Sequence, residues 1–410
     1  MSNVTLQFRS LTTGDDGYYY GTTFNNSAAT FEYGYYSQDS KSFILFKNTI
    51  IPKNAVIVSA YLKLRVNQDG GNPPHVDIYA NDTVTPIAPT NISEYDSLAL
   101  TTATVHSETD AVTSDYTSAD IKSIIQELVD ISAWDIGKNI MLVIKNAGAA
   151  GYGLQVHSIE GAAANIPVLE VTWTLPANWL LKNSGVSGDD GYRWYNQFNT
   201  AGTTIALGGG APGDQMYDYN GFFRFPSVAI PQGRTINHAY LVTVCATVPH
   251  AYTRLRIFFN AADNAVAPTS GSGYDAKTLT VVTDGWDGDF ALAERIYHSP
   301  DLKTTLQEVI DRALWIENNA LMALVKDDDG TFDNDPAAIY AYDNGAKYPL
   351  LLINAVVPAP PISSFDPITG PVGTPVVIAG TGFDPTPANN TVTFNGTVAT
   401  VISSTTTEIV

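Results

Sequence analysis

The sequence of 410 residues has little cysteine and little positive charge. Its single cysteine, Cys245, excludes an intrachain disulfide, and the strand-like apolar run around it predicts a small buried side chain. Lys and Arg number 21 against 41 Asp and Glu, so the formal net charge is −20. Because such a chain repels nucleic acid and no basic cluster compensates, we expect no nucleic-acid partner.

Long hydrophobic runs are also missing from the sequence. No stretch of about 18 apolar residues occurs, which predicts no membrane insertion. The N-terminal residues form neither the basic nor the apolar segment of a signal peptide. Three explanations stay open: the protein works where it is made, it leaves the cell by lysis or a dedicated machine, or its signal has been removed.

Local catalytic signatures are absent as well. The sequence has no Gly-x-Ser-x-Gly elbow, His-Glu-x-x-His motif, phosphate-binding loop or dinucleotide fingerprint. The histidines show no metal-ligand spacing; they are His75, His106, His157, His238, His250 and His298. We therefore expect that the chain is not an enzyme and that it requires no cofactor. A carbohydrate-active enzyme is the less favoured alternative, because two carboxylates across a cleft leave no sequence signature.

A large internal repeat is the most informative feature that is present. The run Gly-Asp-Asp-Gly-Tyr at residues 14–18 recurs at 188–192, and an Ile-Pro-x-x-x-x-Ile-x-x-Ala-Tyr-Leu run at 51–62 recurs at 230–241. A repeated unit of about 175 residues can bury its own core, unlike the short units of solenoids. Duplication of a self-sufficient domain favours a binding or building function, because it multiplies surfaces and valency.

The pattern of both copies predicts mostly β structure. Most segments alternate apolar and polar residues at period two, and Gly, Pro, Asn and Asp turns separate them. Each copy also has one amphipathic stripe that predicts a short helix, preceded by Ser118 or Ser299 as a capping hydroxyl. The stripes are Ile121, Ile124, Ile125, Leu128 and Val129, and Leu302, Leu306, Val309 and Ile310. Trp134 and Trp315 follow these helices, and we expect both in the core. We predict two tandem jelly-roll-like β-sandwiches, at 1–175 and 176–356, followed by an Ig-like β segment at 357–410.

Each copy resembles the DNRLRE-type β-sandwich domains. The resemblance rests on the Ile-Pro run, on apolar strands such as 43–46 and 222–225, and on the closing strands at 167–171 and 348–352. The DNRLRE string itself is absent from both copies. The family includes carbohydrate-binding modules and domains of bacterial surface and phage structural proteins, so the resemblance implies a binding or structural role.

The C-terminal segment resembles an IPT/TIG immunoglobulin-like domain. Gly-Thr-Gly-Phe at 380–383 predicts a tight turn that delivers Phe383 to a core, and Asn395-Gly396 predicts a two-residue hairpin. A free-standing Ig-like sandwich needs roughly 100 residues, about twice the number present. We therefore expect this domain to be incomplete, with its missing strands supplied by further sequence or by a neighbouring subunit.

Acidic, Gly-rich turns supply the candidate metal ligands. Ca²⁺ prefers carboxylate and backbone oxygens from flexible turns. These turns could therefore bind a structural calcium ion. The alternative interpretation is a set of solvated turn residues. The candidate ligands are Asp15, Asp16, Asp189, Asp190, Asp327 and Asp329.

Aromatic residues beside the same turns are the candidate glycan-binding residues, because sugar C–H groups stack on aromatic rings. Strand alternation turns only every second residue the same way, so core or interface positions are the alternative for these tyrosines. The candidates are Tyr18, Tyr20, Tyr36, Tyr192, Trp194 and Tyr195.

The favoured function is that of a virion structural protein, a decoration or fibre-type protein with surface-binding modules. Its expected partners are other virion or surface-assembly proteins, further copies of itself in a homo-oligomer, and a cell-surface polysaccharide. The alternative is a secreted bacterial polysaccharide-binding adhesin, located outside the cell or at its surface.

Overall fold

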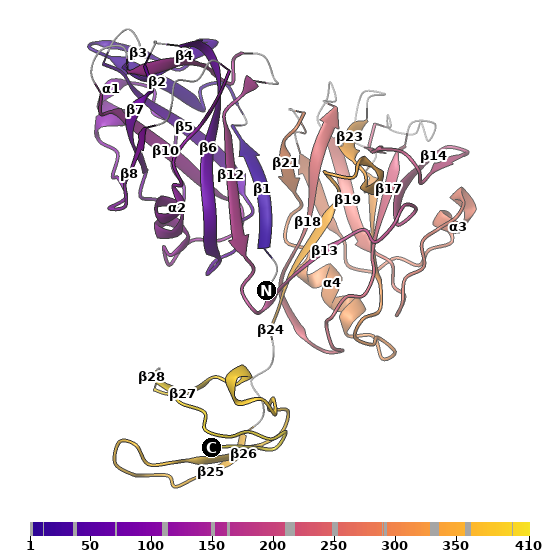
Figure 1. Cartoon of the computed structure of the whole chain (residues 1–410). Coiled ribbons are helices and arrows are strands. Elements are labelled where there is room, and N and C mark those ends of the chain that lie inside the picture. Colours follow the sequence, from indigo (N-terminus) through magenta and orange to yellow (C-terminus); the bar gives the residue numbers. More distant parts are fainter. Residues whose placement is uncertain are drawn as a thin grey trace. The chain divides into compact units, whose positions relative to one another are not determined.

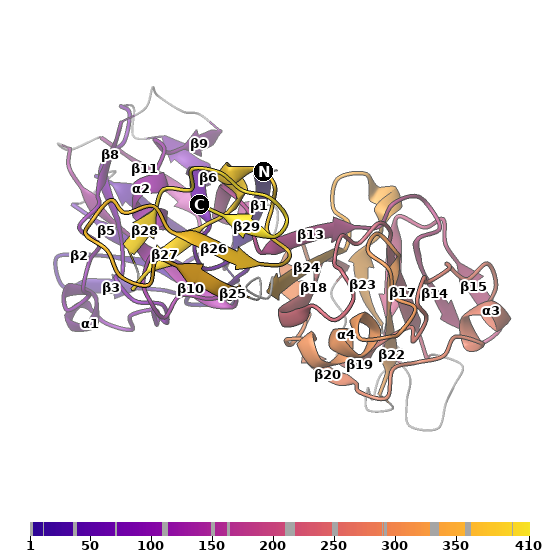
Figure 2. The ribbon, with the colours of Figure 1, turned by 90° about the horizontal axis from the view of Figure 1, so that it is seen from below.

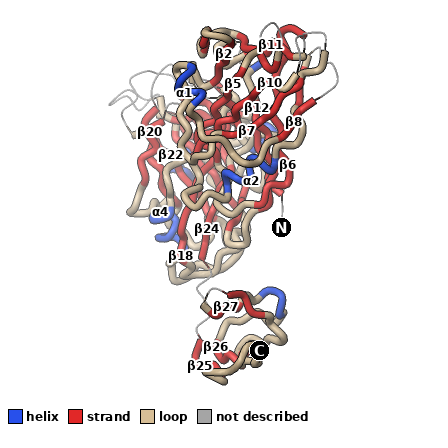
Figure 3. The backbone as a smooth tube through the Cα atoms, turned by 90° about the vertical axis from the view of Figure 1, so that its left-hand side faces the viewer, coloured by secondary structure: helices blue, strands red, loops and turns tan. Residues whose placement is uncertain are grey.

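The computed structural model forms two compact units, Met1–Ala355 and Val356–Val410. The predicted fold class is confirmed: the chain is mostly β, with 47% strand and 9% helix. Figure 3 shows the helices as short segments beside extensive strands. The described residues are 3–10, 12–35, 39–69, 72–108, 114–148, 152–161, 165–209, 218–247, 253–288, 290, 293–328, 336–356, 362–395 and 397–410.

The first copy of the repeat contains two antiparallel sheets (Figure 1). One has the order β1 (Asn3–Arg9), β12 (Val168–Thr174), β6 (Val56–Asp69), β11 (Gly153–His157) and β4 (Thr30–Gly34), with β9 (Asp115–Thr117) also paired to β6. The other has the order β3 (Thr23–Asn25), β2 (Asp16–Tyr20), β5 (Lys41–Thr49), β10 (Lys138–Asn146), β7 (His75–Ala80) and β8 (Val105–Glu108).

The second copy repeats this topology strand for strand. Its first sheet has the order β13 (Trp179–Asn183), β24 (Leu350–Val356), β18 (Thr235–Thr247), β23 (Ala337–Tyr340) and β16 (Thr204–Leu207), with β21 (Ile296–His298) paired to β18. The other has the order β15 (Gln197–Asn199), β14 (Asp190–Trp194), β17 (Asn220–Phe225), β22 (Leu321–Asp327), β19 (Thr253–Phe259) and β20 (Asp284–Gly288). Equal strand order in both copies is the structural counterpart of the repeated sequence motifs.

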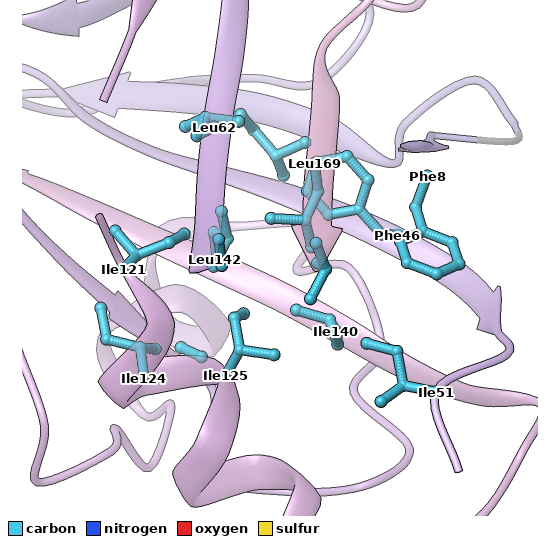
Figure 4. Packing of buried hydrophobic residues seen from close by; sticks show 14 of the residues in the cluster. Phe8, Phe46, Ile51, Leu62, Ile121, Ile124, Ile125, Ile140, Leu142 and Leu169 are labelled. Carbon is cyan, nitrogen blue, oxygen red and sulfur yellow. The ribbon is translucent and has the colours of Figure 1, made fainter. Parts of the chain in front are cut away.

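The core of each copy lies between its two sheets. In the first copy Leu62 and Leu169 from one sheet pack with Leu142 from the other (Figure 4). Helix α2 (Lys122–Val129) covers this core with its apolar stripe, whose members are completely buried. Helix α4 (Lys303–Ile310) does the same in the second copy, as its periodicity predicts.

The predicted serine caps are wrong. Ser118 Oγ accepts a hydrogen bond from Leu62 N at 3.0 Å, and Ser299 Oγ accepts one from Leu241 N at the same distance. The helix starts are held by Asp120 and Asp301, which accept from the amides of residues 122 and 303. The serines instead tie the segment before each helix to the adjacent strand.

Each copy also contains a second, shorter helix that the sequence did not predict. Helix α1 (Ile92–Asp96) is capped by Asn91, and α3 (Gly271–Asp275) is capped by Ser270. Figure 2 shows α3 beside β14 and β15. Five residues contain too little of the 3.6-residue period to stand out from a turn.

The two tryptophans are core residues, as predicted. Trp134 is 1% exposed and its Nε1 donates to the carbonyl of Ile51 at 3.0 Å. Trp315 is 2% exposed and donates to the carbonyl of Ile230 at 2.8 Å. Each indole therefore fixes the Ile-Pro turn of its own copy, which explains why turn and tryptophan recur together. Cys245 is also buried, as predicted.

The unit Val356–Val410 has two small sheets. One has the order β25 (Ile362–Asp366), β26 (Val377–Gly380) and β29 (Glu408–Ile409), and the other pairs β27 (Val392–Phe394) with β28 (Thr397–Ala399). Ile378, Phe383 and Ile409 form the core cluster, so the predicted placement of Phe383 is confirmed. The hairpin residue Gly396 lies outside the described residues. Completion of the unit by further strands stays a prediction.

Candidate functional site

The acidic turn of the first copy places two aspartates in different surroundings. Asp15 Oδ2 accepts from Thr12 N at 2.8 Å, and Asp15 Oδ1 lies 2.6 Å from the Lys47 ammonium. Asp16 is 1% exposed and its Oδ2 accepts from Ile159 N at 2.9 Å. The first aspartate closes the turn and is neutralised by a cation, whereas the second points into the protein.

The same division recurs in the second copy. Asp189 Oδ2 accepts from Gly185 N at 3.1 Å, and its Oδ1 lies 2.7 Å from Arg224. Asp190 is 1% exposed and accepts from Tyr342 N at 2.7 Å. Lys47 and Arg224 do not occupy equivalent strand positions, because it is the backbone amides of Leu45 and Arg224 that donate the equivalent hydrogen bonds, to the carbonyls of Asp15 and Asp189.

Burial raises the pKa of both inner aspartates. Desolvation raises the pKa of Asp16 well above its usual range, and the neighbouring Glu160 carboxyl adds to the effect. Desolvation likewise raises the pKa of Asp190 to about 6, with a smaller contribution from Asp343. Glu160 follows the residue that donates to Asp16, just as Asp343 follows the residue that donates to Asp190. Each copy therefore has an acidic pair at matching positions, and sequence reasoning missed the second member of each.

The remaining calcium candidates do not join these turns. Asp190 is in register with Phe223, which pairs with Ala323 of β22, whereas Asp327 stands at the far end of that strand opposite Leu255. Asp329 lies outside the described residues. Since Asp15 and Asp189 already face cations, a calcium ion at these turns would have to compete with Lys47 and Arg224. Structural calcium stays a prediction.

The tyrosines of β2 alternate between the two faces of their strand. Tyr19 is 5% exposed and packs against Tyr95 of α1. Tyr18 and Tyr20 are half-buried and stack on each other, with ring centroids 6.0 Å apart. Tyr36 lies outside the described residues. The structure thus brings two of the three first-copy candidates together.

The second copy contains a larger aromatic group, which we call the β14 aromatic stack: Tyr192, Trp194 and Tyr219. The rings of Tyr192 and Trp194 lie 5.0 Å apart, and those of Trp194 and Tyr219 lie 5.7 Å apart, both in stacked orientation. All three side chains are half-buried, and the neighbouring Tyr195 is 51% exposed. Tyr219 was not among the candidates, because only the pairing of β14 with β17 brings it to the other two rings. Its place in a tyrosine-rich segment just before β17 is the only sequence signal for it.

Backbone packing positions the β14 aromatic stack. Gly191 precedes Tyr192, and a Cβ at this glycine would lie 2.2 Å from the carbonyl oxygen of Asn199. Because glycine has no Cβ atom, β15 can approach β14 closely at Gly191. In this pairing Gln197 lies opposite Trp194. On the other face Arg193 pairs with Asp275 of α3 at 3.0 Å. An exposed amide beside stacked rings can provide both hydrogen bonds and apolar contact to a sugar.

Comparison with known proteins identifies one domain. Residues 360–410 match the family model of the IPT/TIG domain. No curated protein matches the chain. Among the described residues, no helix is long and apolar enough to span a membrane.

Several solved structures match most of the chain at low identity. PNGase F, a glycosylasparaginase from Flavobacterium meningosepticum, is 10% identical, with 86% of this chain and 96% of that chain covered and a TM-score of 0.22. A chain of naturally occurring empty particles of Cowpea mosaic virus is also 10% identical, with 87% and 88% covered and a TM-score of 0.21. Allantoicase from Saccharomyces cerevisiae is 7% identical, with 75% and 79% covered and a TM-score of 0.21. Likenesses of this size assign no activity to this chain.

The expectation that the chain is not an enzyme is corrected: an enzyme, PNGase F, is among the matched structures, so we withdraw the exclusion and assign no activity in its place. It rested on missing local motifs, and such motifs detect only sites whose residues are close in sequence. The acidic pair of Asp16 and Glu160 illustrates the weakness, because its members come from opposite ends of the first copy. Missing motifs therefore give no ground for excluding catalysis.

Proposed function

We propose that this chain is a structural and binding protein of a virion or comparable surface assembly, and that its sandwiches bind polysaccharide. The observation that carries the binding part is the β14 aromatic stack, with its three half-buried rings and the exposed Tyr195 beside them. Aromatic faces at a protein surface bind the C–H faces of sugars, and nearby amides bind hydroxyl groups.

The first copy supports the same function at a second position. Tyr18 and Tyr20 occupy the places of Tyr192 and Trp194, and they stack in the same manner. Two weak sites on one chain increase avidity for a polymer that presents the same sugar repeatedly. We propose that the second copy provides the stronger site, because its indole offers the larger apolar face.

The sharpest test compares two aromatic truncations in the full chain. We expect W194A to weaken retention by an immobilised polysaccharide about tenfold or more, equivalent to roughly 1.4 kcal/mol. The matched control is F394A, which removes a ring that is 48% exposed in the IPT/TIG unit. Affinity electrophoresis across a panel of bacterial polysaccharides provides the measurement. Equal retention of W194A and F394A on every polysaccharide that holds the wild type would refute the role of the stack.

The assembly part of the proposal concerns location and partners. It is supported by the duplication, which gives the chain two sandwiches of the same strand order, and by the IPT/TIG domain at 360–410. We propose virion or surface-assembly proteins and further copies of this chain as partners. We also propose that the tandem sandwiches are DNRLRE-type domains. Mass spectrometry of purified particles tests the location, and light scattering tests the oligomer. Recovery of the chain only as free protein outside cells would favour the adhesin alternative.

A further inference from the structure

Strands β7 and β8 bring together two pairs of polar side chains, His75 with Asp77 and His106 with Glu108, that are about 30 residues apart in sequence. The two strands are antiparallel, with His75 opposite Glu108 and Asp77 opposite His106. Successive residues of a strand point to opposite faces, so all four lie on one face of the sheet. Val76 and Ile78, which alternate with them, are completely buried on the other face.

The contacts among these side chains form a connected set. His75 Nε2 lies 3.0 Å from Glu108 Oε1, and His106 Nε2 lies 3.9 Å from Glu108 Oε2. One ligand atom from each of His75, His106 and Glu108 lies within 4.8 Å of the other two. Ligand atoms around a tetrahedral zinc ion, each about 2.0–2.1 Å from the metal, are roughly 3.4 Å apart. Small side-chain rotations therefore suffice to enclose an ion.

The fourth side chain fixes the orientation of one imidazole. His106 Nδ1 lies 2.9 Å from Asp77 Oδ1, which leaves Nε2 directed toward Glu108. A carboxylate on the far nitrogen is the usual partner of a metal-binding histidine, because it fixes the tautomer and the ring. The ring of His75 is held as well, since it packs against Tyr152 with centroids 4.6 Å apart.

We propose that His75, His106 and Glu108 form a divalent metal site that takes Zn²⁺, with Asp77 as a positioning residue. Two imidazoles and one carboxylate suit zinc rather than calcium, which prefers oxygen ligands alone. Three protein ligands leave the fourth position for water or another molecule. Strand β8 is the edge of its sheet, and the side chains of His106 and Glu108 are 49% and 57% exposed, so the ion can enter from solvent.

The second copy provides an internal contrast. The equivalent strands β19 and β20 place Arg254 opposite Asp287 and Arg256 opposite Gly285. Both histidines are replaced, one of them by a guanidinium, which does not bind metal cations. We therefore expect one Zn²⁺ per chain. The histidine positions showed no ligand spacing along the sequence, but His-x-Asp at 75–77 and His-x-Glu at 106–108 are a signal once both segments are strands.

Calorimetric titration of the full chain with Zn²⁺ alone, and absorption spectra with Co²⁺, test the proposal. The wild type should bind one ion, and Co²⁺ should show the intense visible bands of a four-coordinate site. H106A should weaken binding at least 100-fold, and D77A about 10- to 100-fold. The control H157A removes a histidine of β11 outside the cluster and should bind like the wild type.

A further variant protects the test against a folding defect. H75R introduces the arginine that the second copy has at the equivalent position, where Arg254 stands opposite Asp287. The strand pair should therefore form while zinc binding is lost. Thermal unfolding without metal should give the same midpoint for H75R, H106A and wild type. The proposal is overturned if the wild type binds no Zn²⁺, if H106A and H75R bind it unchanged, or if H157A loses as much affinity as they do.

Discussion

At the scale of single residues, the two aspartates of each Gly-Asp-Asp-Gly turn contribute to stability with opposite signs. The outer aspartate gains a cationic partner, whereas the inner one is buried and forms no ion pair with the residues that the structure describes. For Asp190 the difference between a pKa of about 6 and the ordinary 3.8 corresponds to roughly 3 kcal/mol. Because folding raises the pKa of Asp190, the folded protein is more stable while this carboxyl is protonated than when it is ionised.

D190N should therefore stabilise the protein at neutral pH. The wild type loses stability as pH rises from about 4 to about 6, because the folded state holds a proton that the unfolded state has released. An amide can still accept the hydrogen bond from Tyr342 N and carries no charge. Urea unfolding should show a gain of up to about 3 kcal/mol at pH 8 that shrinks toward pH 4.

The outer aspartate is the matched control for this prediction. D189N removes the charge that faces Arg224, so it should lower the unfolding free energy at pH 8 by about 1–3 kcal/mol. A loss of stability at pH 8 in D190N similar to that in D189N would contradict the assignment of opposite roles.

At the scale of elements, the order and closeness of strands decide which side chains meet. Gly191 allows β15 to approach β14, and Gly17 has the same role in the first copy, where a Cβ would lie 2.6 Å from the carbonyl oxygen of Asn25. The repeated Gly-Asp-Asp-Gly-Tyr motif therefore encodes a turn, a buried acid, a close strand approach and the first ring of an aromatic pair.

G191A should disturb β14 and the aromatic stack together. The added methyl group meets the carbonyl of Asn199 and the ring of Phe222, and such overpacking costs about 1–3 kcal/mol. Polysaccharide retention should fall with stability, because Tyr192 and Trp194 follow the displaced backbone. G285A on β20 is the control, since nothing lies within 4 Å of its Cβ position, and it should change stability by less than about 0.5 kcal/mol. Equal effects of the two substitutions would show that close approach at Gly191 is unimportant.

The sequence predicted those elements whose pattern is long enough to read. Helices α2 and α4 were predictable because their apolar stripes extend over two turns, whereas α1 and α3 end before a period is visible. The site was only half predictable for a related reason. Tyr192 and Trp194 are neighbours on one strand, but Tyr219, Glu160 and the pairing of His75 with Glu108 depend on strand order, which alternation does not encode.

At the scale of the whole molecule, the repeat and the C-terminal unit differ in how much core they contain. The first copy contributes most of one large buried cluster, and Tyr240, Val242 and Leu352 of the second copy belong to the same cluster. In the described part of the C-terminal unit, the core cluster contains three buried apolar side chains. Small units bury a smaller fraction of their surface, so their stability is marginal.

These differences predict that the chain unfolds in separate steps. Differential scanning calorimetry of the full chain should show a weak transition at lower temperature for Val356–Val410 and a larger one for Met1–Ala355. A protein that ends at Ala355 should lose the first transition and keep the second within about 2 °C, because the larger unit retains its own cores. It should also retain the wild-type Zn²⁺ stoichiometry and polysaccharide retention, since both sites lie in the repeat. A drop of several degrees in the main transition after truncation would show instead that the C-terminal unit stabilises the sandwiches.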